Sequence, residues 1–209
     1  MHNLRACFST QSKLWLQSLL GVLGILWMLC SCSRPIVVHP PSAVEKEKRE
    51  ALILDQVRRL GQNGDWLVIR GYHATDHLVS AITNAPFSHA AVLDLVRDQV
   101  IEAEAPGVHA APLMDLVKRS HRLMLIRPMW AIEQRGQEAL ARARELVGKR
   151  YDFLGLVGLN QRDRYYCTEL AVAIYRSHAR HSDHIPPIIP PHQLHYWGTI
   201  LFDSGAVLE

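Results

Sequence analysis

Four short apolar runs in the middle of the chain are the feature that most constrains its fold. They span residues 66–69, 87–93, 100–103 and 123–126. Glycine, proline or charged residues bound each run, which is typical of buried strands. Because only residues 94–98 separate the second run from the third, we expect these strands to be antiparallel neighbours. A further apolar run near 199–202 predicts a last strand.

Apolar residues at helical spacing predict helices on both sides of these strands. The expected helices span residues 43–60, 75–83, 132–147 and 167–178. Ser42 is a suitable N-cap for the first helix, Gly61 or Gly64 can end it, and Gly148 is a suitable C-cap for the third. Strands that follow one another, with helices before and after them, predict an α+β protein with one main core.

The N-terminus is typical of a targeting segment. Arg5 and Lys13 precede a mostly apolar run at residues 14–29, whose 16 residues fall short of the about 20 that span a bilayer comfortably. The run ends in Leu29-Cys30-Ser31-Cys32, which resembles a bacterial lipobox. That resemblance implies cleavage before Cys32 and diacylation of its sulfur. The alternative is an uncleaved signal anchor.

The lipobox implies three segments. These are a signal peptide at 1–31, a lipidated tether with the N-terminal helix at 32–63, and the main domain at 64–209. The lipid on Cys32 would make the membrane a partner of the chain. Ser33, in place of aspartate, is the residue expected for an outer-membrane lipoprotein that faces the periplasm.

Charge and cysteine content exclude some classes of protein. Once Arg5 and Lys13 leave with the signal peptide, 21 basic residues face 20 acidic ones, so no basic excess is available for nucleic acid. Cys7 and Cys30 leave with the same segment, and Cys32 is consumed by lipid. Cys167 then remains as the single thiol of the mature chain, with no cysteine to pair with.

Cys167 lies where a predicted helix begins, after the polar loop 161–164. Free backbone N–H groups and the positive end of the helix dipole favour a thiolate there, and a thiolate attacks carbonyl carbons. The alternative is a buried cysteine that acts as a small apolar residue.

His89 and Glu102 are polar residues within apolar strands. On adjacent antiparallel strands joined by a short turn, the two side chains can lie side by side. A histidine held by a carboxylate is the usual partner of a nucleophilic cysteine. Glu104 has the same strand parity as Glu102 and competes with it. The alternatives are a histidine satisfied by backbone groups and a carboxylate that faces water.

The order of these motifs resembles the circularly permuted branch of the papain-like, NlpC-type hydrolases, the YiiX/YaeF-like group. Lecithin:retinol acyltransferase is a more distant relative of that group. The resemblance runs from about residue 64 to 194 and is carried by Gly64-Asp65-Trp66-Leu67, Phe87-Ser88-His89-Ala90-Ala91-Val92, Val100-Ile101-Glu102-Ala103, Gly107-Val108, Arg127, Gly148, Tyr151-Asp152-Phe153 and Tyr166-Cys167-Thr168-Glu169-Leu170.

The resemblance implies a permuted papain-like fold in which a small antiparallel sheet packs against the cysteine helix. It implies Cys167 as nucleophile, His89 as general base and acid, and Glu102 as the third residue. The backbone N–H of Cys167 is the expected oxyanion donor, with Tyr166 as a side-chain candidate. The implied function is an envelope-anchored cysteine hydrolase that cleaves an amide or ester through a thioester, on a peptidoglycan-type peptide or a lipid-linked acyl group.

Several alternatives stay open at this point. A lipid acyltransferase or phospholipase of the same superfamily, or a non-catalytic lipoprotein that binds through the same fold, fits the same motifs. Leu154, Leu156, Val157 and Leu159 could line an acyl pocket or form plain core. His178, His181 and His184 are spaced for a metal site, although we expect a solvated surface and neither metal nor cofactor. The substrate and the oligomeric state are undetermined.

Overall fold

A computed structural model describes residues 37–205, apart from the side chains of Ile82 and Thr83. The chain divides into two compact units, Met1–Pro35 and Ile36–Glu209, and the described residues all belong to the second. The signal segment at 1–31 and Cys32, with its expected lipid, lie outside the described residues. Within residues 37–205, no helix is both long enough and apolar enough to cross a membrane.

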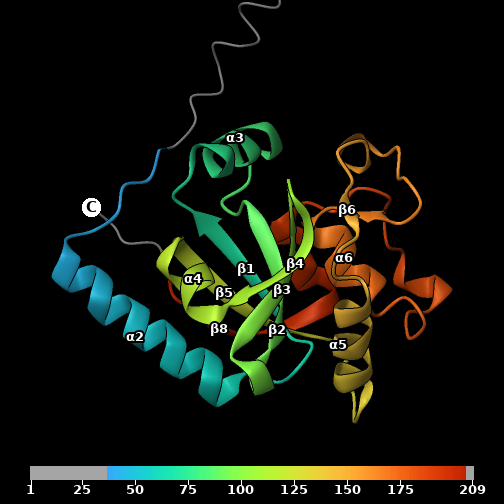
Figure 1. Ribbon diagram of the computed structural model, residues 1–209, viewed down its shortest axis with the longest axis horizontal. Coiled ribbons are helices and arrows are strands. Elements are labelled where there is room, and N and C mark those ends of the chain that lie inside the picture. The colour runs from blue at the N-terminus through green and yellow to red at the C-terminus, as the bar shows by residue number, and fades with distance from the viewer. Residues whose placement is uncertain (1–36, 206–209) are drawn as a thin grey trace, which may run out of the picture. The chain divides into compact units, whose positions relative to one another are not determined.

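A six-stranded antiparallel sheet forms the centre of the domain, in the order β4-β3-β2-β1-β5-β8 (Figure 1). Its strands are β1 (Trp66–Gly71), β2 (His89–Asp94), β3 (Gln99–Glu104), β4 (Gly107–Pro112), β5 (Ser120–Pro128) and β8 (Gly198–Asp203). Two short strands, β6 (Arg150–Tyr151) and β7 (Arg164–Tyr165), form a separate parallel pair. They enclose the loop that leads to Cys167.

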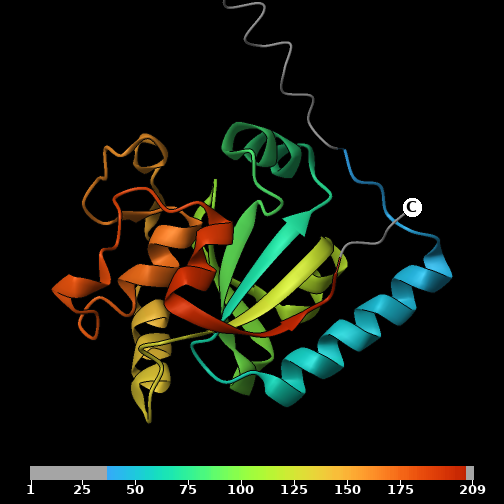
Figure 2. The same ribbon diagram turned by 180° about the vertical axis from the view of Figure 1, so that it is seen from behind.

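Helices cover both faces of this sheet. Helices α2 (Ala43–Leu60) and α4 (Leu113–Lys118) pack on one face, and α5 (Arg135–Glu145) and α6 (Cys167–Ala173) pack on the other (Figures 1 and 2). Helix α3 (Ala74–Thr83) connects β1 to β2 at one edge of the domain. Short 3-10 turns connect the other elements, at Leu95–Arg97, Gly155–Val157, His181–Asp183 and Pro191–Trp197.

The alternation of side chains along β1 explains why its sequence is apolar throughout. Trp66 and Val68 belong to the core beneath α5 and α6, whereas Leu67 and Ile69 belong to the core beneath α2 and α4. All four side chains are fully buried. A strand covered on both faces needs apolar residues at every position, in contrast to a strand with one solvated face.

The α+β class predicted from the sequence is confirmed, as is the antiparallel sheet that packs against the cysteine helix, and the first helix has the predicted bounds. Ser42 caps it by accepting a hydrogen bond from the Glu45 N–H, and Gly61 ends it. The third helix begins at Arg135, later than predicted, because Glu133 has a left-handed φ of 56° that no helix accommodates. Helix α6 ends at Ala173, after which the chain continues in tighter turns such as the one closed by the Tyr175 N–H and the Val172 carbonyl.

One hairpin strand and one helix, β4 and α4, are not predicted by the sequence pattern. Pro106-Gly107 is the reason, because this pair is typical of the end of an element. Gly107 instead turns the chain directly into β4 with a φ of 119°, a conformation that favours glycine. Helix α4 follows β4 at once, beginning at Leu113.

A buried ion pair between Asp65 and Arg127 offers a test of this packing. Asp65 is fully buried, its Oδ2 lies 3.0 Å from Arg127 Nη2, and the Gln62 N–H donates to the same oxygen. Burial raises the pKa of Asp65, and Arg127 and the Gln62 N–H partly offset that rise. Arg127→Ala should lower the free energy of unfolding by about 3–5 kcal/mol in chemical denaturation, because it leaves a buried carboxylate without its cation.

Arg142→Ala is the matched control, since Arg142 bonds the Ser177 hydroxyl at the surface. It should change stability by less than about 0.5 kcal/mol. Equal losses in the two variants would contradict the interpretation of Asp65–Arg127 as a buried pair.

Candidate active site

Helix α6 presents Cys167 in its first turn. Tyr166 is the N-cap residue, and its backbone N–H donates to the Glu169 carboxylate at 3.4 Å. Burial raises the pKa of that carboxyl to about 7. The buried Thr168 hydroxyl donates to the Ile189 carbonyl, which ties the start of α6 to the segment before Pro191. Cys167 itself is buried, with 8% of its surface exposed.

Two hydrogen bonds fix α6 against the sheet. The indole N–H of Trp66 in β1 donates to the Ala171 carbonyl at 3.0 Å. The Tyr175 hydroxyl, just beyond the helix, donates to the Gly64 carbonyl at 3.0 Å. Strand β1 thus contacts the cysteine helix through the Trp66 side chain. It also pairs along its edge with β2, the strand that begins at His89. This arrangement sets the position of the thiol relative to the histidine.

The structure brings Cys167, His89 and Glu102 together. His89 is the first residue of β2. Glu102 of β3 pairs with Ala91 of β2, two residues after His89, so the histidine and the glutamate are diagonal neighbours across the two strands. His89 Nε2 lies 2.7 Å from Glu102 Oε2, and both side chains are buried. Cys167 is the other interacting neighbour of the imidazole, and its interaction with His89 raises the pKa of His89. The imidazole therefore lies between a carboxylate and a thiol.

These neighbours change the proton affinity of both groups. Burial by itself lowers the pKa of His89, but its hydrogen bonds and charge interactions with Cys167 and Glu102 outweigh burial and raise that pKa to about 10. Burial raises the pKa of Glu102, yet His89, Arg119 and His109 reverse the effect and hold it below the usual range. An imidazolium beside a carboxylate is therefore the stable form of the pair at neutral pH.

Arg119 is a member of this cluster that was not predicted from the sequence. It donates one guanidinium N–H to Glu102 and another to Glu104. Glu104, the predicted competitor, thus holds Arg119 and lies farther along β3 from the Glu102–His89 contact. Arg119 is the C-cap residue of α4, the helix that the sequence did not predict, so no sequence signal pointed to it.

The metal-binding capacity of the described residues lies in this same cluster. Ligand atoms of His89, Glu102 and Glu104 come within 4.8 Å of one another. The guanidinium of Arg119 bonds both carboxylates, however, and already supplies the positive charge there. His178, His181 and His184 form no such grouping in the described part of the chain, and His178 Nε2 instead lies 3.2 Å from Glu138.

Two tyrosines near Cys167 differ in what their hydroxyls contact. The Tyr166 hydroxyl donates to the Pro187 carbonyl and accepts from the Ile189 N–H, so the side chain predicted as an oxyanion donor is directed toward that segment. Tyr151 interacts electrostatically with Cys167 and Glu104. Its pKa is raised, first by burial and then by these neighbours, so the phenol keeps its proton.

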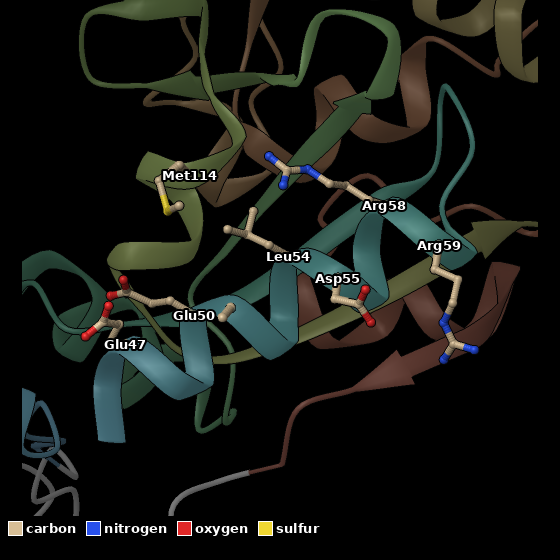
Figure 3. A pocket seen from close by; sticks show the side chains of 8 residues that line it. Glu47, Glu50, Leu54, Asp55, Arg58, Arg59 and Met114 are labelled. Atoms are coloured by element: carbon tan, nitrogen blue, oxygen red, sulfur yellow. The ribbon is translucent and has the colours of Figure 1, made fainter. Parts of the chain in front are cut away.

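Leu154, Leu156, Val157 and Leu159 do not belong to the core, which is one of their two predicted roles. Each exposes between 45% and 66% of its surface. The acyl-pocket role stays a prediction. Among the hollows of the described surface, the one shown in Figure 3 lies between α2 and α4 and is lined by Glu47, Glu50, Leu54, Arg58 and Met114, among others. It is across the sheet from α6 and contains none of the residues that surround Cys167.

In chain order, one strand supplies the histidine, the next strand supplies the carboxylate, and the start of a later helix supplies the cysteine. This order is typical of a permuted papain-like protein. The family model for "permuted papain-like amidase enzyme, YaeF/YiiX, C92 family" matches residues 62–186. The chain belongs to this family, which confirms the predicted permuted papain-like fold.

One similar solved structure is that of the metalloprotein yiiX from Escherichia coli O157:H7. It is 23% identical, with a TM-score of 0.48, and the match covers 56% of this chain and 66% of that one. The chain thus spans slightly less than two thirds of that protein. Comparison with curated proteins gives no match.

The protonation of His89 can be measured directly by NMR of its ring nitrogens. Because its folded pKa of about 10 exceeds the unfolded value of about 6.5, the proton stabilises the fold fully below pH 6.5 and loses that effect as pH rises toward 10. We expect the imidazolium signal to persist above pH 8. In Glu102→Gln the loss of the carboxylate charge should lower the midpoint by at least about one pH unit.

Glu104→Gln is the matched control on the same strand. Because Glu104 bonds Arg119 and is not bonded to His89, this variant should move the His89 midpoint less. A larger shift in Glu104→Gln than in Glu102→Gln would assign the third position to Glu104 instead.

Proposed function

We propose that this protein is a cysteine hydrolase that cleaves an amide or ester bond through a thioester intermediate. Cys167 acts as nucleophile, His89 as general acid and base, and Glu102 as the residue that orients the imidazole. The observation that carries the proposal is the position of His89, which lies 2.7 Å from Glu102 and also interacts with Cys167. Such an arrangement activates a thiol and stores its proton.

In the acylation step, the Cys167 sulfur forms a bond to the substrate carbonyl carbon. The resulting tetrahedral oxyanion is stabilised by the Cys167 backbone N–H, at the positive end of α6. The bond from carbon to nitrogen or oxygen then breaks, and the His89 imidazolium gives its proton to the leaving amine or alcohol.

In the second step, water attacks the thioester carbonyl and His89 accepts its proton. The carbon–sulfur bond breaks, which releases a carboxylic acid and regenerates the thiolate–imidazolium pair. Glu102 stays ionised throughout, and Arg119 holds its carboxylate in place. An acceptor other than water in this step would make the protein an acyltransferase, so product analysis separates the two outcomes.

A thiol-reactive probe tests whether Cys167 is activated. We expect rapid alkylation near pH 6.5, none in Cys167→Ala, and a rate about 100-fold lower in His89→Ala, because an ordinary thiol with a pKa near 8.5 is about 1% ionised at that pH. His109→Ala is the matched control. His109 also approaches Glu102, at 3.6 Å, but it is not bonded to Cys167 and should leave the rate nearly unchanged.

Labelling that rises only near pH 8.5 and does not depend on His89 would contradict the enzymatic proposal. It would support the second candidate function, a lipoprotein that binds a partner through the same fold.

We further propose that the chain is anchored in the bacterial envelope by lipid on Cys32 and faces the periplasm from the outer membrane. The lipobox-like Leu29-Cys30-Ser31-Cys32 supports this proposal. Peptidoglycan-type peptides and lipid-linked acyl groups would then be the substrates within reach. In a bacterial host, metabolic labelling with palmitate should be lost in Cys32→Ser and retained in Cys30→Ser. Labelling that persists in Cys32→Ser would contradict the anchor.

A further inference from the structure

The segment between β6 and β7 exposes a cluster of large apolar side chains. We call residues 153–159 the apolar loop. Phe153, Leu154, Leu156, Val157 and Leu159 each expose between 45% and 66% of their surface. Exposed apolar residues on an ordinary protein surface are scattered singly, whereas here five large ones fall within seven positions. Such clusters mark contact surfaces.

Backbone hydrogen bonds hold the apolar loop in this exposed conformation. The fully buried Asp152 carboxylate accepts hydrogen bonds from the N–H groups of Leu154, Gly155 and Gln161, at 3.1, 2.8 and 2.7 Å. The Leu159 N–H also donates to the Leu154 carbonyl at 3.0 Å. Asp152 thus closes the loop from the inside, and its apolar side chains project outward from an ordered backbone. The hydrogen bonds to Asp152 therefore hold these apolar side chains in an exposed position.

The residues that flank the apolar loop are basic. The segment 149–164 contains four basic and two acidic residues. Of the two acids, Asp152 is buried in the loop, and Asp163 pairs with Lys149 at 3.0 Å. The remaining charges are those of Arg150, Arg162 and Arg164, and Arg150 and Arg164 lie opposite each other in the β6–β7 pair. Apolar side chains with a positive border match a bilayer interface with anionic headgroups.

The apolar loop lies at an edge of the domain that has a further exposed apolar residue. In both ribbon views the loop, in orange, and α3 lie along the upper part of the domain (Figures 1 and 2). Leu78 of α3 exposes more than half of its surface. The loop begins two residues after Tyr151, which interacts electrostatically with Cys167, and Gly155 of the loop lies against the ring of Tyr166, the residue before Cys167.

We propose that the apolar loop docks the folded domain on a bilayer that contains anionic phospholipid. Phe153, Leu154, Leu156, Val157 and Leu159 enter the boundary between headgroups and acyl chains, and the three arginines contact lipid phosphates. This contact is additional to any lipid on Cys32 and does not depend on the chemistry of Cys167. It fixes the orientation of the folded domain relative to the bilayer.

Site-specific fluorescence in the full chain tests this contact. Val157→Trp places an indole in the apolar loop, and the full chain is reconstituted into vesicles of phosphatidylglycerol with brominated acyl chains. We expect the added fluorescence to be quenched in large part relative to unbrominated vesicles. Val96→Trp is the matched control, because Val96 is an exposed valine on the 3-10 turn after β2. Its added fluorescence should not be quenched.

The other outcomes each overturn the proposal. Quenching at both positions, or at neither, shows that the loop does not dock specifically. Equal quenching in phosphatidylcholine and phosphatidylglycerol vesicles, unchanged by Arg150→Gln with Arg162→Gln, removes the role of anionic lipid. A blue shift in the added emission of the Val157→Trp variant that depends on protein concentration without lipid assigns the loop to a second copy of the chain. The quenching measurement is repeated with Cys167→Ala added to the Val157→Trp variant. Quenching should persist there, because docking does not depend on the cysteine chemistry that thiol labelling tests.

Discussion

Burial of both faces of the central strands is the constraint on which the rest of the structure depends. β1 and β2 carry apolar residues at consecutive positions, and each face of the sheet must therefore be covered by helices. Helices α2 and α4 cover one face, and α5 and α6 cover the other. The position of Cys167 follows from this packing, because α6 is held against β1 by the Trp66 indole and lies next to the strand that begins with His89.

Three buried carboxylates of this domain are each paired with an arginine. Asp65, Asp94 and Glu102 are almost completely buried, and each is bonded by an arginine from another element: Arg127, Arg144 and Arg119, respectively. A buried carboxylate without such a partner would cost several kcal/mol or take up a proton. At Asp65 and Asp94 the pair joins secondary structure elements. At Glu102, the oxygen bonded by Arg119 is Oε2, and the same oxygen contacts His89, so this pair is also part of the reactive site.

Much of this could be predicted from local sequence. The Ala43–Leu60 helix, with its Ser42 cap, and the buried strands were predictable because capping and apolar periodicity are local properties. β4 and α4 were not predictable in this way, because Pro106-Gly107 indicates a turn but not whether a strand follows it. Arg119 was missed for the same reason. The core role predicted for Leu154, Leu156, Val157 and Leu159 was wrong because composition alone does not distinguish a buried leucine from an exposed one.

The sequence by itself determined the set of chemical groups and their order along the chain: His89 and Glu102 on neighbouring strands, then Cys167 at a helix start. It did so because strand pairing across a short turn, and the start of a helix, depend on residues close in sequence. Only the tertiary structure decided which side chains contact one another and which are exposed. Arg119 reaches Glu102, the Tyr166 hydroxyl is bonded to residues 187–189, and the apolar loop is exposed, since each outcome depends on packing between segments far apart in the chain.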